Sequence, residues 1–113
     1  MEPLGEQGLY GAFERIARVS SRPGYRGCPF VRAALELPSD HPALKPIASY
    51  KRSLRGRVER HLRAAQVPNR REMVMQVILL IDAAATECAT ERRSYPAHIG
   101  RRLVESSIAA NRR

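Results

Sequence analysis

The side chains best suited to chemistry in this chain are spaced in ways that favour neither catalysis nor metal binding. The histidines and cysteines that could bind a metal are His41, His61, His98, Cys28 and Cys88. Metal sites usually combine ligands at short spacings such as Cys-x-x-Cys or Glu-x-x-His, which this sequence lacks. It also lacks a Gly-rich phosphate loop and a nucleophile elbow, and Ser106-Ser107 has no base nearby in sequence. We therefore expect no catalytic residues, no metal and no cofactor.

Asp82 is the residue that points most clearly to a binding site. It interrupts the apolar run from Met73 to Ala85, in which Gln76 is the other polar residue. An unpaired carboxylate among apolar side chains is costly, so it must pair, accept hydrogen bonds or line a wet cavity. Two interpretations stay open. Asp82 and Gln76 are polar anchors in an apolar effector pocket, or Asp82 pairs with an arginine or bonds across a dimer interface.

Cys28 allows two interpretations as well. It precedes Pro29 at the start of a predicted helix, where backbone amides can lower the pKa of a thiol. A redox-sensing thiol and a small buried hydrophobe are both compatible with this position, whereas Cys88 is expected to be a packing residue. Since no secretory signal precedes the cysteines and no apolar run is long enough to span a bilayer, we expect a reduced, cytoplasmic protein without membrane contact.

The basic composition favours acidic partners without fixing the fold. The chain has 113 residues, 43% of them apolar, and 20 Lys and Arg against 11 Asp and Glu give a net charge of +9. That length suffices for one domain with its own core. The arginines are scattered as doublets, and no aromatic residues alternate with them as base-stacking platforms would require. Most of them are therefore expected to form solvated helix faces.

Five helices and no strand are predicted from apolar spacing and from helix start and stop signals. Their expected ranges are residues 7–20, 29–37, 40–65, 71–92 and 94–111. Pro29 fits the first turn of the second helix, which must stop before Pro38. Ser39 or Asp40 is expected to cap the third helix, and Pro46 predicts a kink or a late start there. The second helix is so apolar that we expect it to be a largely buried wedge.

The fourth predicted helix is apolar nearly all round, so it must be covered on more than one side. One interpretation is a central helix in a monomer, and the other is a two-fold dimer in which the last two helices of each subunit form a four-helix bundle. We favour the dimer. The interface residues expected on these two helices are Val74, Ile78, Ile81, Ala85, Ile99, Leu103 and Ile108.

One stretch resembles the C-terminal domain of tetracycline-repressor (TetR) family transcription regulators. It comprises Gly27-Cys28-Pro29-Phe30-Val31, then Ala33-Ala34 and Glu36, and the helix start Asp40-His41-Pro42. The resemblance implies an all-α, five-helix orthogonal bundle whose last two helices dimerise. It also implies a small apolar effector, and a homodimer or a heterodimer with a related regulator. On that architecture the effector would contact Phe30, Tyr50, Leu54, Met73, Gln76, Val77 and Asp82, although such positions are more often ordinary core.

The resemblance to TetR-type regulators implies that the chain is a single regulatory domain, residues 1–113. Residues 1–24 would be a remnant of a connecting helix and turn, residues 25–110 the sensing and dimerising core, and residues 111–113 a tail. The family's DNA-reading helix-turn-helix has no corresponding residues here, so DNA contact is expected to be indirect or weak. The alternative is a small basic helical protein that binds nucleic acid or an acidic partner directly through Lys51, Arg52, Arg55, Arg60 and Arg63.

Overall fold

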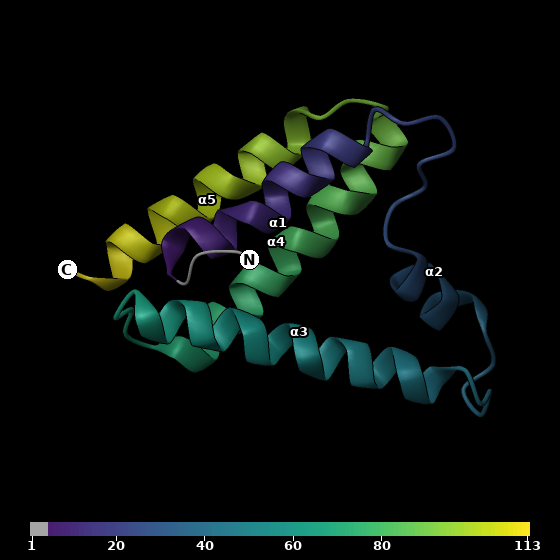
Figure 1. Cartoon of the computed structure of the whole chain (residues 1–113), viewed down its shortest axis with the longest axis horizontal. Helices are drawn as coiled ribbons and strands as arrows, with labels where there is room; N and C mark the ends of the chain where they lie inside the picture. Colours follow the sequence, from purple (N-terminus) through teal and green to yellow (C-terminus); the bar gives the residue numbers. More distant parts are fainter. Residues whose placement is uncertain (1–4) are drawn as a thin grey trace.

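The computed structural model describes residues 5–113, which form five α-helices and no strand (Figure 1). The helices are α1 (Glu6–Val19), α2 (Pro29–Glu36), α3 (Leu44–Ala64), α4 (Arg70–Glu91) and α5 (Tyr95–Asn111). The all-α prediction is confirmed, and the helices lie within a few residues of their expected ranges. Expectations that rest on Met1–Leu4, including the absence of a leader, lie outside the described residues.

Prolines set two of these helix boundaries. α2 begins at Pro29 and ends before Pro38, as the chain chemistry requires. α3 begins late, at Leu44, which places Pro46 in its first turn, where a missing N–H group costs nothing. The prediction that Ser39 or Asp40 caps this helix was wrong: Ala43 holds the capping position, and no side chain bonds the first turn.

The core lies where α1, α4 and α5 run side by side and α3 crosses them (Figure 1). Its largest fully buried side chains are Phe13, Leu62, Met73, Ile108, Val67, Val77, Val104 and Cys88. α5 approaches α1 closely at Gly100. A Cβ atom there would lie 2.7 Å from Cε1 of Phe13, closer than such atoms normally come. This contact fixes the spacing between the two helices.

The segment expected to be a connecting remnant contributes to this core. Leu9, Tyr10 and Phe13 of α1 are buried, and α1 contacts α3, α4 and α5. Two ion pairs tie it to α5: Arg101 to Glu14 at 2.7 Å and Arg112 to Glu6 at 2.6 Å. α1 is therefore a structural part of the domain. That residues 1–24 are the remnant of a connecting helix and turn stays a prediction.

α2 stands apart from the other helices, and the prediction that it is a buried wedge was wrong. None of its residues is buried, and Leu35 is 82% exposed. Its main packing is on α3, where the Phe30 ring stacks on Tyr50 with centroids 4.3 Å apart. An eight-residue helix between two prolines is too short to bring its apolar side chains into a core already filled by α1.

α4 is the one described helix whose length and composition would allow it to cross a bilayer. The core helix of a globular domain meets the same criterion. α4 packs against α1, α3 and α5, and its buried residues belong to the common core. The fold thus uses α4 as its central helix.

Candidate functional site: two hollows beside α4

The first hollow, which we call the four-helix pocket, has a volume of about 400 Å³ and is bounded by α1, α2, α3 and α4. A volume of this size is within the usual range for small-molecule sites. Apolar and small side chains form most of its walls. They are Gly8, Leu9, Gly11, Ala12, Ile16, Val19, Gly27, Pro29, Phe30, Leu54, Val58, Ile81 and Ala85. Its polar members are Arg15, Tyr25, Cys28, Tyr50, Arg57, His61 and Asp82.

Four of the seven predicted effector contacts line this pocket, namely Phe30, Tyr50, Leu54 and Asp82. The other three do not. Met73 and Val77 are fully buried near the α3–α4 turn, where the helices pack directly on one another, and Gln76 is half-buried outside the pocket. The structure therefore does not bring the first half of α4 to this pocket, and the effector contacts expected there stay a prediction.

Asp82 pairs within its own chain. Its Oδ2 atom lies 2.5 Å from Nζ of Lys51 on α3, and both side chains are about one-quarter to one-third exposed. The carboxylate is therefore compensated without an arginine from a partner. Because it also lines the pocket, the two open interpretations of Asp82 are combined: it is paired and it borders a cavity.

Two arginines of the pocket, Arg15 on α1 and Arg57 on α3, have no such compensation. Within residues 5–113 neither guanidinium group has a carboxylate within 4.0 Å. Both side chains are exposed, so they lie at the rim of the pocket. Burial raises the pKa of Tyr50, and nearby Arg57 partly opposes this effect. Tyr50 and Arg57 are seven residues apart on α3, about two helical turns, so both project from the same face of the helix into the lining of the pocket.

The α1 wall and the loop before α2 are the parts of the pocket that sequence reasoning missed. Gly8, Ala12 and Arg15 share one face of α1, because they are three or four residues apart. Gly8 and Ala12 are small, so this face leaves space beside the helix. Tyr25 donates a hydrogen bond from its hydroxyl group to the carbonyl oxygen of Ala85 at 3.3 Å. This bond holds the loop against α4 and closes one side of the pocket.

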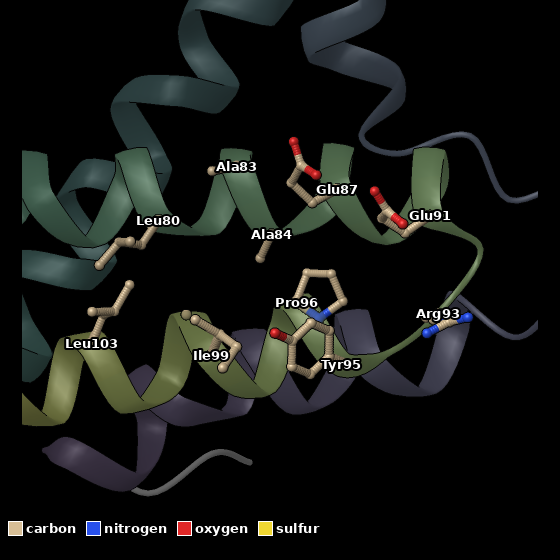
Figure 2. Close-up of a pocket in the computed structure, with 11 residues that line it drawn as sticks. Leu80, Ala83, Ala84, Glu87, Glu91, Arg93, Tyr95, Pro96, Ile99 and Leu103 are labelled. Carbon is tan, nitrogen blue, oxygen red and sulfur yellow. The ribbon is translucent and has the colours of Figure 1, made fainter.

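The second hollow is a groove of about 420 Å³ between α4 and α5, here called the α4–α5 groove. Figure 2 shows Leu80 and Ala84 on α4 pointing toward α5, where Leu103 and Ile99 lie, with Glu87 and Glu91 farther along α4. Its lining residues are Leu80, Ala83, Ala84, Glu87, Glu91, Arg93, Tyr95, Pro96, Ile99, Gly100 and Leu103.

The predicted dimer contacts divide between core and surface. Ile99 and Leu103 line the groove, whereas Ile81 lines the four-helix pocket. The remaining four residues are buried within the chain itself, so the structure does not bring them to the exposed face, and their part in an interface stays a prediction. They are Val74, Ile78, Ala85 and Ile108. α4 is apolar all round, so periodicity alone could not show which face the neighbouring helices cover.

The exposed apolar surface beside the groove comes mainly from residues that were not predicted. Leu79 is 60% exposed, Met75 and Tyr95 are also exposed, and Leu103 is 47% exposed. Met75, Leu79 and Ala83 follow steps of four along α4 and form one stripe. Apolar side chains gathered on one face in this way are typical of interaction surfaces.

The basic face proposed for direct nucleic-acid binding is only partly free. Lys51 pairs with Asp82, and Arg63 pairs with Glu59 at 2.7 Å. Arg52, Arg55 and Arg60 are exposed.

Both cysteines are free thiols, with Cys88 buried and Cys28 half-buried. Within residues 5–113 no cluster of three potential ligands could hold a metal ion.

Comparison with known proteins adds no further identification. No family model, no curated protein and no solved structure matches the chain. Its function must therefore be argued from the two hollows and the helix that separates them.

Proposed function

We propose that this chain is a TetR-type regulatory domain that binds a small effector in the four-helix pocket and associates with a second copy through the α4–α5 groove. The observation that carries the proposal is the pocket itself. Four helices border it, its walls are mainly apolar, and a few polar groups are spaced around it. This combination is typical of ligand sites.

Self-association is supported by the chemistry of the α4–α5 groove. Its middle is apolar, its α4 side carries Glu87 and Glu91, and Arg93 lies just before α5. Within the described chain none of these three charges has an ion-pair partner. A two-fold axis brings the same patch of two copies together, so a patch with both acids and bases can be complementary to itself.

α4 connects the two activities. One side of this helix provides Ile81, Asp82 and Ala85 to the pocket, and another provides Leu80 and Ala83 to the groove. A ligand that prefers one position of α4 would also favour one arrangement of the two subunits. Coupling of this kind requires only that the ligand bind the two states with different affinity.

The proposal is tested by filling the pocket. Ala12→Leu adds three carbon atoms to a half-buried pocket residue, whereas the matched change Ala48→Leu adds them at an exposed position on α3. We expect apolar small molecules to raise the melting temperature of the wild type and of Ala48→Leu. Ala12→Leu should lose that response while keeping its helical circular dichroism.

The proposed sensor function fails if no small molecule in a chemically diverse set stabilises the wild type. It also fails if Ala12→Leu responds as the wild type does.

Direct nucleic-acid binding is the second candidate function. It is favoured by Arg52, Arg55 and Arg60, because these exposed basic side chains lie on one side of α3. Tight binding of DNA that weakens steeply with salt, in the absence of any pocket ligand, would support that candidate instead.

A further inference from the structure

The charges that border the four-helix pocket restrict the class of its ligand. The lining contains one carboxylate, Asp82, which Lys51 already neutralises at 2.5 Å. It also contains Arg15 and Arg57, which have no carboxylate partner within residues 5–113. A cationic ligand would meet two like charges and no free acid. An anionic ligand would meet two guanidinium groups able to donate hydrogen bonds to it.

Such an excess of positive charge is not found in every hollow of this basic chain. The α4–α5 groove of the same molecule has the opposite balance in its lining, with Glu87 and Glu91 against Arg93. The two arginines of the pocket also come from α1 and α3, which contact each other. Groups from two neighbouring helices can converge on one ligand.

The rest of the lining sets the other half of the ligand. Phe30 stacks on Tyr50 to form an aromatic wall, and Leu9, Leu54 and Ile81 add aliphatic surface. A ligand that was charged throughout would leave these side chains facing a polar group. An apolar body would remove them from water and gain the free energy of that burial.

We propose that the pocket takes a small amphiphilic anion, a carboxylate with an apolar body, whose charged end is bound by Arg15 and Arg57 at the rim. This inference rests on the proposed sensor function and adds the chemical class of the effector. Arg57, on the same face of α3 as Tyr50, contributes to the discrimination between a charged and a neutral head group.

The test uses three probes with the same eight-carbon chain: octanoate, 1-octanol and octylammonium. Titration calorimetry on the whole chain should show octanoate binding about tenfold more tightly than 1-octanol, with octylammonium weakest, because charge-assisted hydrogen bonds are the stronger kind. Raising the ionic strength should weaken octanoate binding and leave 1-octanol binding unchanged.

Two matched variants separate the pocket charge from the general charge of the protein. Arg57→Gln should weaken octanoate binding about fivefold to tenfold and change 1-octanol binding less than about twofold. Arg52→Gln removes the same charge from an exposed position of α3 outside the pocket, and it should leave both affinities unchanged. Because both arginines are exposed, neither substitution removes core packing.

The outcomes distinguish the two levels of the proposal. If octanoate and 1-octanol bind equally, or if Arg57→Gln and Arg52→Gln behave alike while Ala12→Leu still blocks binding, the charge inference is overturned and the pocket remains a ligand site. Preferential binding of octylammonium overturns the charge inference as well. If none of the three probes binds and diverse apolar molecules also fail to stabilise the wild type, the sensor function itself is wrong.

Discussion

The two sides of α4 are built to different standards of packing. Toward α5 and α1 the helices touch so closely that Gly100 has no room for a Cβ atom beside Phe13. Toward α2 a cavity of about 400 Å³ remains, and none of the residues of α2 is buried. Hollows of similar volume lie on both sides of α4, so the two sides differ in how firmly the neighbouring helix is packed: α5 contributes buried residues to the core, and α2 contributes none.

Polar contacts reinforce this difference. The α1–α5 contact has Arg101 over the Tyr10 ring at 4.8 Å, in addition to its ion pairs, and burial together with nearby Glu6 raises the pKa of Tyr10 to about 12. On the other side, α2 has only a partly exposed internal ion pair, Arg32 to Glu36 at 3.9 Å. Segments with few buried contacts open locally at low cost, as a ligand site needs, whereas an interface needs a fixed surface.

The largest effect is expected on self-association, from a substitution in the α4–α5 groove. Leu103→Glu places a charge in the middle of the apolar part of the groove, where a second copy would have to bury it. If the groove is the interface, this change should raise the dissociation constant of a dimer by at least about 100-fold. Sedimentation equilibrium over micromolar concentrations measures that constant, and circular dichroism shows whether the variant remains folded.

Leu35→Glu is the matched control, since it adds the same charge to an 82% exposed leucine on α2. It should leave self-association unchanged. A wild type that stays monomeric at high micromolar concentration would contradict the proposed interface. Equal weakening by both substitutions would show that net charge, and not the groove, controls association.

Two glycines within helices test the packing difference itself. Gly100→Ala places a Cβ atom 2.7 Å from a fully buried ring, and the cost of overpacking should exceed the gain of about 1 kcal/mol in helix propensity. We expect a net loss of about 1–2 kcal/mol in the free energy of unfolding. Gly56→Ala on α3 meets only the end of the Arg60 side chain, at 3.6 Å, so it should stabilise by about 0.5–1 kcal/mol.

Urea denaturation of the two variants provides the measurement, and the informative quantity is the sign of each change. Opposite signs support a tightly packed α5 side. If Gly100→Ala is as stable as Gly56→Ala, α5 and α1 are not tightly packed at Gly100, and the proposed difference in packing between the two sides of α4 is wrong.

The helices could be predicted from sequence because their limits depend on local chemistry. Pro29, Pro38 and the Val67–Asn69 break act through backbone restrictions that hold in any fold. Burial could not be predicted as well, because it depends on which neighbour arrives. The apolar α2 was expected to be buried, yet none of its residues is, whereas α1 contributes Leu9, Tyr10 and Phe13 to the core. On α4, Val74 and Ile78 match Met75 and Leu79 in character, and only the positions of α1, α3 and α5 separate core from surface.

The smallest effect is expected on the local stability of α2, which borders the four-helix pocket. Phe30→Ala removes the ring that stacks on Tyr50, a contact worth about 0.5–1.5 kcal/mol. Since α2 contributes no buried residue, this loss should leave the global free energy of unfolding nearly unchanged and should instead increase local opening of α2 about fivefold to tenfold. Amide hydrogen exchange would detect it as faster exchange within α2, with α4 and α5 unaffected. Leu35→Ala, on the same helix but without a stacking partner, should exchange as the wild type does. If Phe30→Ala instead lowers protection across α4, the pocket side is coupled to the core, and the two sides of α4 are not independent.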